Sequence, residues 1–120
     1  MEAKALSDQV ADLLDSHSDD VYGLWEVDWW FNGQCPTWNK ERRIEFFTDV
    51  VERQLVDVFF GPMRDELNPL PMELAVVALG TWDNWSPRCP LDQPVYHVMT
   101  NEAGVAALRA HMADGDGQAV

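Results

Sequence analysis

The side chains that could act as catalysts are few and widely spaced in this chain. Three histidines stand far apart, at positions 17, 97 and 111, and none belongs to an HxxxH or HExxH pattern. No GxSxG, GxGxxG or P-loop sequence occurs. His97 falls in a predicted strand, where we interpret it as a structural histidine. We therefore predict that the protein is not an enzyme and uses no cofactor.

Two groups of acids invite a metal or acid–base interpretation. The run DSHSDD, residues 15–20, lacks the spacing and the glycine of a calcium-binding EF-hand loop, and we interpret its acids as helix caps. Glu26 and Asp28 are two positions apart, so on a helix they diverge by about 200°. They would converge only if their segment were a strand. The sequence therefore predicts no metal site.

The two cysteines and the apolar pattern bear on the compartment. Cys35 and Cys89 each precede a proline; they could form one disulfide, but they make no CxxC pattern. No signal-peptide pattern begins the chain, and no apolar stretch approaches the ~20 residues that span a bilayer. We predict a cytoplasmic protein with reduced thiols and no membrane association.

The balance of charge is strongly acidic. The 120 residues contain 21 acids and 8 bases, a net charge of −13, and 47% hydrophobic residues. The length and the apolar fraction predict one folded domain. The charge opposes contact with nucleic acid and anionic membranes and suits a basic protein partner. The alternative interpretation is that the charge only keeps the protein soluble.

The hydrophobic periodicity and the positions of turn-forming residues predict a mostly helical chain with two strands. The predicted single domain covers residues 1–112, and residues 113–120 are predicted to be a disordered tail. The first helix is expected over residues 3–15, and the second from a cap at Ser18 or Asp19 to a stop at Asn32-Gly33. The third is expected from a cap at Thr37 or Asn39 through Leu55, the fourth over 69–80, and the last from a cap at Thr100 to Met112. Strands are expected over 56–60 and 94–100.

The stretch YGLWEVDWWFNG, residues 22–33, is the most unusual in the chain. Alternation would place Trp25, Val27, Trp29 and Phe31 on one side of a strand, whereas helical spacing would make a helix that is apolar over most of its circumference. The acid-rich start and the Asn-Gly stop favour the helix. On that helix, Trp25 and Trp29 lie one turn apart, and we predict that both are core residues.

Several residues are candidates for contact with a partner. Trp82 and Trp85 lie in a predicted loop, where large aromatic side chains can anchor an interface or close the base of a small fold. Exposed acids are the other candidates, before the second helix and after the first strand. The candidate partner-binding residues are Asp15, Asp19, Asp20, Asp65, Glu66, Trp82 and Trp85.

The order of the predicted elements resembles a winged helix, in which a long helix runs into the first of two wing strands. The segment Met99–Gly104 is similar to the T-x-x-G start that often follows the second wing strand, but it is one residue longer. The chain also resembles a group of small, acidic actinobacterial proteins. The resemblance spans roughly residues 20 to 110 and is carried by LWEV (24–27), LVDVFFGP (55–62), the helix from Pro71 to Leu79, and NWSP (84–87). It implies an α+β fold, winged-helix-like and mostly helical with a short antiparallel β-hairpin.

The long helix would be the DNA-reading helix of a winged-helix regulator. It carries four bases, Lys40, Arg42, Arg43 and Arg53, but also four acids, Glu41, Glu45, Asp49 and Glu52. The near-neutral helix on a strongly acidic chain favours a protein-binding domain, such as an immunity protein or another inhibitor of a basic nucleic-acid enzyme. The alternative is a transcription regulator that kept its DNA-binding face.

Overall fold

The computed structural model describes residues 6–18, 21–61, 68–86 and 95–118, with side chains described as far as residue 113. Helices and strands are mixed in the chain, as expected for an α+β protein. In chain order the elements are α1 (Asp8–Ser16), β1 (Tyr22–Gly23), α2 (Leu24–Gln34), α3 (Lys40–Glu52), β2 (Val56–Gly61), α4 (Met72–Leu79), the 3₁₀ helix η1 (Trp82–Trp85), β3 (Val95–Thr100) and α5 (Glu102–Gln118).

The described strands form one antiparallel sheet in the order β1-β3-β2. Val98 in the central strand is the register partner of Val58 on one side and of Tyr22 on the other. The prediction of a two-stranded hairpin was therefore wrong. Tyr22 and Gly23, expected within a helix, extend to pair with the edge of β3 that β2 leaves free. The chain between β2 and β3 also includes α4 and η1, which makes it much longer than a hairpin turn.

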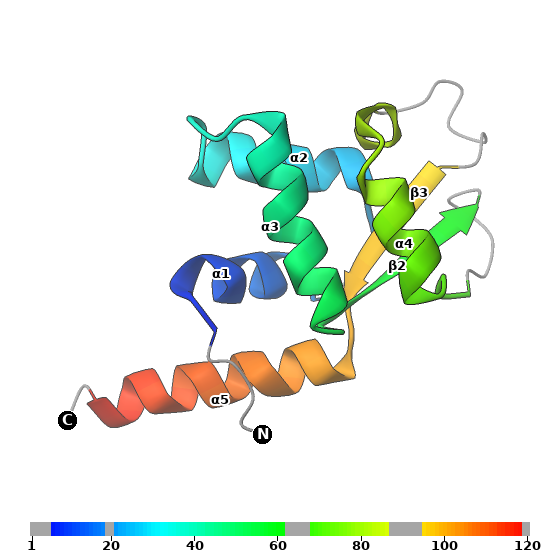
Figure 1. The fold of residues 1–120 in the computed structure, drawn as a ribbon. Coiled ribbons are helices and arrows are strands. Elements are labelled where there is room, and N and C mark those ends of the chain that lie inside the picture. Colours follow the sequence, from blue (N-terminus) through cyan, green and yellow to red (C-terminus); the bar gives the residue numbers. More distant parts are fainter. Residues whose placement is uncertain (1–5, 19–20, 62–67, 87–94, 119–120) are drawn as a thin grey trace.

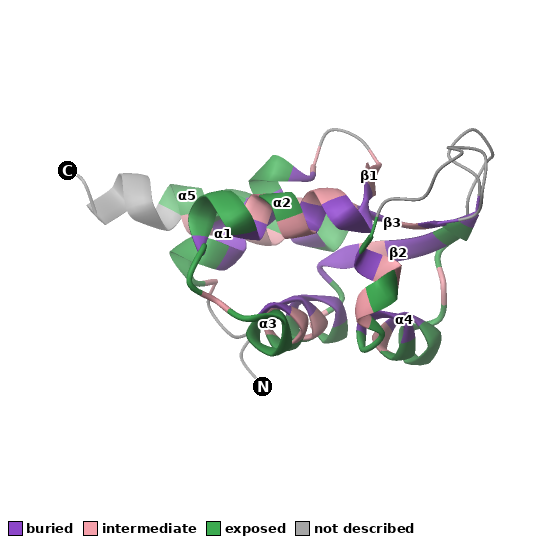
Figure 2. Cartoon of the chain, turned by 90° about the horizontal axis from the view of Figure 1, so that it is seen from above, coloured by how far each residue is buried: buried purple, intermediate pink, exposed green. Residues whose placement is uncertain are grey.

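Helices α3 and α4 lie side by side over one face of the sheet (Figure 1), and the two helices contact each other. The view from above places both in the same layer, with their exposed residues turned away from the sheet (Figure 2). Helix α5 runs beside α1. The outer surfaces of α3 and α4 therefore form one continuous side of the molecule.

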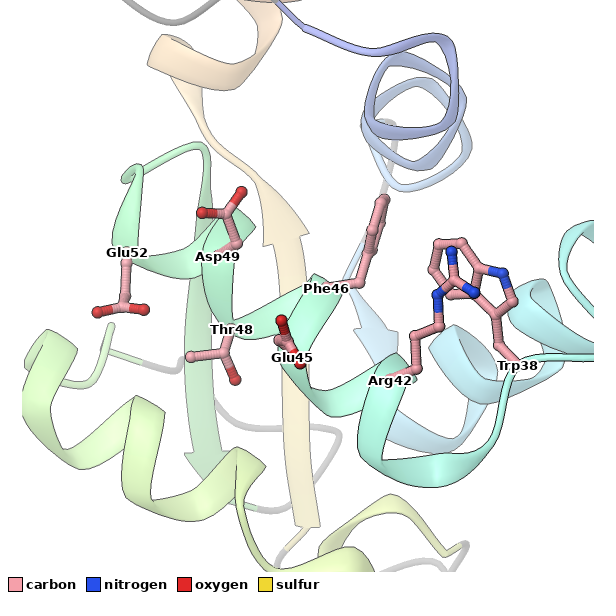
Figure 3. Close-up of a pocket in the computed structure, with 7 residues that line it drawn as sticks. All are labelled: Trp38, Arg42, Glu45, Phe46, Thr48, Asp49 and Glu52. Carbon is pink, nitrogen blue, oxygen red and sulfur yellow. The ribbon is translucent and has the colours of Figure 1, made fainter.

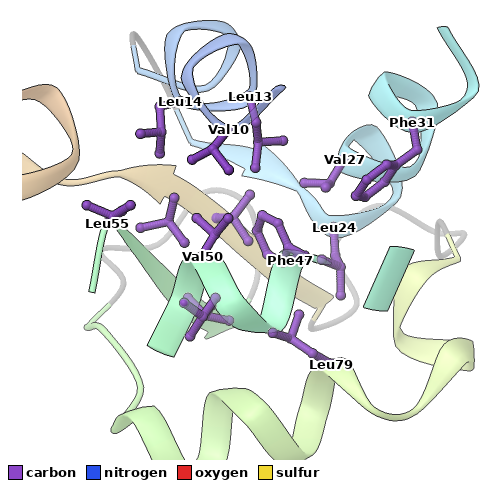
Figure 4. Packing of buried hydrophobic residues seen from close by; sticks show 14 of the residues in the cluster. Val10, Leu13, Leu14, Leu24, Val27, Phe31, Phe47, Val50, Leu55 and Leu79 are labelled. Atoms are coloured by element: carbon purple, nitrogen blue, oxygen red, sulfur yellow. The ribbon is translucent and has the colours of Figure 1, made fainter. Parts of the chain in front are cut away.

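One hydrophobic core joins the elements (Figure 4). Its largest members are fully buried, and burial of each such side chain is worth about 1.5–3 kcal/mol. Every described helix from α1 to α4, together with η1, β2 and β3, contributes at least one side chain to it. The fully buried aromatic and leucine side chains are Leu13, Leu14, Leu24, Phe31, Phe47 and Leu79.

The stretch that opens with Tyr22 is a helix from Leu24, which confirms the preferred interpretation. It begins later than the predicted cap at Ser18 or Asp19, because the Gly23 backbone N–H donates to Glu26 Oε2 at 2.8 Å and caps the helix there. Asp28 points to a different partner, Arg43, so the two acids diverge as predicted.

Of the two tryptophans predicted to be core, only Trp25 is buried, at 9% exposure. Trp29 is 59% exposed, so its assignment to the core was wrong. The buried stripe of α2 runs through Leu24, Val27 and Phe31, and Trp29 lies about 140° around the helix from Leu24. Trp25, in the first turn, is covered by the sheet, where its ring meets His97 edge-on at 6.5 Å.

The last helix is capped one residue later than predicted. Asn101 Oδ1 accepts from the Gly104 backbone N–H at 2.9 Å, which is the capping contact. The Thr100 hydroxyl instead donates to the Leu14 carbonyl at 2.8 Å and ties β3 to α1. Helix α5 continues to Gln118, into the segment predicted to be a disordered tail. None of the described helices has the length and apolarity to cross a membrane.

Candidate partner-binding surface

Helix α3 is positioned by a cap and by a buried stripe. Asn39 Oδ1 accepts from the Arg42 backbone N–H at 2.9 Å, as one of the two predicted caps. Phe47, Val50 and Val51 are buried against the core and fix which side of the helix faces inward. The positions of α3 outside this stripe therefore lie toward the surface.

Arg43 belongs to the inner side of α3 and is only 8% exposed. Its Nη1 donates to Asp28 Oδ1 at 2.8 Å and to Asn32 Oδ1 at 2.7 Å, both on α2. Its Nε donates to the Trp38 carbonyl at 3.0 Å. This guanidinium is satisfied by the protein and ties α3 to α2, so it is not presented to a nucleic acid.

The outer side of α3 carries four acids beside the exposed bases Lys40 and Arg42. Glu41, Glu45 and Asp49 follow at four-residue intervals, and Glu52 completes a row that covers about 80° of the helix. All four side chains are exposed, and we call them the acidic row. Asp49 approaches Arg53 at 3.7 Å, whereas the three glutamates make no ion pair among the described residues. Like charges at this spacing destabilise a helix by about 0.2–0.5 kcal/mol a pair.

A groove of about 550 Å³ lies along this acidic side (Figure 3). One end is aromatic: the Arg42 guanidinium carbon lies 4.1 Å from the centre of the Trp38 ring, and Phe46 meets that ring edge-on at 5.3 Å. The rest is lined by Glu45, Thr48, Asp49 and Glu52. Figure 3 shows Thr48 and Glu52 on the side of α3 nearer α4.

These groups suit the binding of cations. Carboxylates accept charge-assisted hydrogen bonds from lysine and arginine, and an indole face attracts a guanidinium. The Trp38 ring is already contacted by Arg42, so the exposed carboxylates are the groups that would meet such cations. Within residues 6–18, 21–61, 68–86 and 95–113, no group of three or more His, Cys, Asp and Glu side chains could hold a metal ion. The groove therefore presents exposed carboxylates that could accept hydrogen bonds from lysine or arginine side chains.

The histidines are held in separate places. His97 is fully buried in β3, and its Nε2 lies 3.0 Å from the Gly61 carbonyl. His111 contacts Asp8 at the surface at 3.2 Å. His17 is buried at the end of α1, where its Nδ1 lies 2.8 Å from the Leu13 carbonyl. A structural role fits His97 as predicted from the sequence.

The residues predicted to bind a partner do not gather at the groove. Asp15 is exposed on α1, and Asp19, Asp20, Asp65 and Glu66 lie outside the described residues. Trp85 is 2% exposed and donates from Nε1 to the Leu79 carbonyl at 3.0 Å, so it is a core residue. Trp82 is half-buried and stacks on Trp85 with ring centres 5.3 Å apart. Both tryptophans close the end of the fold.

From the sequence we predict only that the four acids of the acidic row make the long helix nearly neutral, and not that they share one side. The signal for the shared side was the angular order: Glu41, Glu45 and Asp49 recur every four residues, while Arg43 shares the apolar stripe with Phe47 and Val50. Placing each charge on the helical wheel would have separated the inward base from the outward acids.

Comparisons of the chain with protein-family models, with curated proteins and with solved structures found no match. The resemblance to small actinobacterial proteins stays a prediction.

Proposed function

We propose that this chain is a non-enzymatic protein-binding domain whose partner is a basic protein, and that the groove beside the acidic row is its main contact. The observation that carries the proposal is the sorting of charge on α3. Arg43 is turned inward to Asp28, and Glu41, Glu45, Asp49 and Glu52 are turned outward. A net charge of −13 adds a long-range field of the same sign.

The small size and acidic charge of the chain support a role as an inhibitor. Proteins that act on nucleic acids carry basic surfaces, so a compact acidic domain can cover such a surface and block it. We propose an inhibitor of a basic nucleic-acid-binding protein, such as an immunity protein or a phage-type antagonist. Cys35 is buried and forms no disulfide within the described residues, and Cys89 lies outside them. We propose action in the reducing cytoplasm.

The fold proposal is a winged-helix-like scaffold put to protein binding. Helix, strand, two helices, two strands and a helix follow in that order, with α4 and η1 inserted before the last strand. In a DNA-binding relative of this scaffold, α3 would be the reading helix. The alternative function, a transcription regulator, would need that helix to meet phosphates with its acidic row, which is repulsive.

Affinity capture from the native host tests the function with three baits. The wild-type bait should recover a protein of net positive charge, and a Glu45→Lys/Asp49→Lys bait should recover at least about tenfold less of it. The control bait, Asp8→Lys/Glu102→Lys on α1 and α5, changes net charge equally and should recover nearly as much as wild type. An acidic partner, equal recovery by the first two baits, or specific capture of a DNA fragment would refute the proposal.

A further inference from the structure

Helix α4 buries small side chains and exposes large ones. Ala75 and Ala78 face the core at 2% and 6% exposure, together with Leu79. Leu74 and Val77 are 57% and 71% exposed. An ordinary surface helix has the opposite arrangement, with its larger apolar residues inward. An exposed apolar face of this kind is typical of a surface that packs against another apolar surface.

The sheet continues this apolar surface. Phe60 at the end of β2 is 48% exposed, and its ring lies 4.7 Å from that of Tyr96 on β3. Together with Leu74 and Val77, the two rings line a groove of about 320 Å³ that also includes Leu70. We call this the α4 groove. Its lining is mainly apolar and could contact apolar side chains of a partner.

The charged side chains on the described elements next to the α4 groove bear on which partner it fits. The charged side chains on β2, α4 and η1 are Asp57, Glu73 and Asp83, and all are acidic. The only basic side chain on β3, that of His97, is fully buried. A second copy of this chain would have to approach against a net charge of −13 on each copy. An anionic membrane meets the same repulsion.

We propose that the α4 groove receives the apolar side of a basic amphipathic helix that belongs to the partner protein. Leu74 and Val77 form an i, i+3 ridge, the arrangement that packs between the side chains of another helix. Helix α3 packs against α4, so the acidic row on that neighbouring helix adds to the negative field that the cationic side of this segment would meet. The inference rests on the proposed function, to which it adds the kind of segment that is bound.

Two synthetic peptides test the inference directly. Both have about 18 residues, five helical turns, and the same number of leucines and lysines. In one, the leucines share a helical face; in the other, they are spread around the helix. Fluorescence anisotropy in about 0.15 M salt should show that the wild-type protein binds the amphipathic peptide at least about tenfold more tightly than the scrambled one.

Leu74→Gln/Val77→Gln should remove this preference, because the apolar face is lost while helix propensity is retained. Met112→Gln on α5, where the side chain is 57% exposed, is the matched control and should keep the preference. Equal binding of the two peptides by wild type, or an unchanged preference in the α4 variant, would overturn the inference. So would self-association of the wild type that the α4 variant abolishes.

Charge reversal separates this inference from the proposed function. Glu45→Lys/Asp49→Lys should weaken both peptides and leave their ratio unchanged. A retained preference with no overall weakening would refute the role of the acidic row and leave the α4 groove standing. Overall weakening with no preference for the amphipathic peptide would refute the α4 groove and leave the acidic row standing.

Discussion

Arg42 and Arg43 are adjacent in sequence and differ in what they contact. Arg42 lies exposed over the Trp38 ring, whereas Arg43 is buried between α2 and α3 with three hydrogen-bond acceptors. The two bases therefore contribute very differently to stability. The sequence alone groups them as one basic pair, and only the direction of the apolar stripe separates them.

Arg43→Met should destabilise the fold, because it leaves Asp28 without its cation. Removing one partner of a fully buried pair costs about 3–5 kcal/mol, and we expect about 2–3 kcal/mol here since 23% of the Asp28 side chain is exposed. Thermal denaturation should show a Tm lower by roughly 8–12 °C. Arg42→Met should lose only about 0.5–1 kcal/mol. Equal losses in the two variants would contradict these roles.

The exposed and buried tryptophans of α2 give a second contrast. Trp25→Ala should cost about 3–5 kcal/mol, because Trp25 is buried against the sheet. Trp29→Ala should change the stability by no more than about 0.5 kcal/mol, since Trp29 is 59% exposed. Urea denaturation of both variants checks this. A larger loss for Trp29→Ala would place its ring in a contact that the fold does not show.

At the scale of the elements, sequence reasoning worked where a pattern was local. The strand at Val56–Gly61, the strand at Val95–Thr100 and the Asn39 cap follow from nearby residues. The third strand could not be foreseen, because Tyr22 and Gly23 are extended only through pairing with β3, far along the chain. The α4 groove was missed for a related reason: α4 is apolar at every position except Glu73, so periodicity does not reveal which side faces the core.

Gly104 fixes how α5 meets the rest of the fold. A Cβ at this position would collide with the Leu55 carbonyl oxygen and lie 2.7 Å from Thr100 Cγ2. Gly104→Ala should therefore destabilise by about 1–3 kcal/mol, despite the better helix propensity of alanine. Gly33→Ala is the control: no atom lies within 4 Å of the new Cβ, so it should be neutral or stabilise by up to about 1 kcal/mol. Paired thermal melts distinguish the two, and a stabilised Gly104→Ala would contradict the close contact.

At the scale of the whole molecule, the main feature is the large excess of acidic over basic residues. A net charge of −13 exceeds the magnitude of about 2–8 that keeps a small domain soluble. The acidic row lies on α3 and one wall of the α4 groove lies on α4, and these are neighbouring helices of one layer (Figures 1 and 2). Long-range attraction would bring a basic partner to this side, and the apolar contact would slow its departure.

The most direct test of the central claim is the association rate of the captured partner with wild type and with Glu45→Lys/Asp49→Lys, measured from about 0.05 to 0.5 M NaCl. For wild type we predict a rate that falls steeply as salt rises, because screening shortens the range of the attraction. The variant should associate at least about tenfold more slowly at low salt and show a flatter dependence, with an unchanged Tm. Equal rates and equal salt dependence in the two proteins would contradict the claim that the acidic row is the working surface.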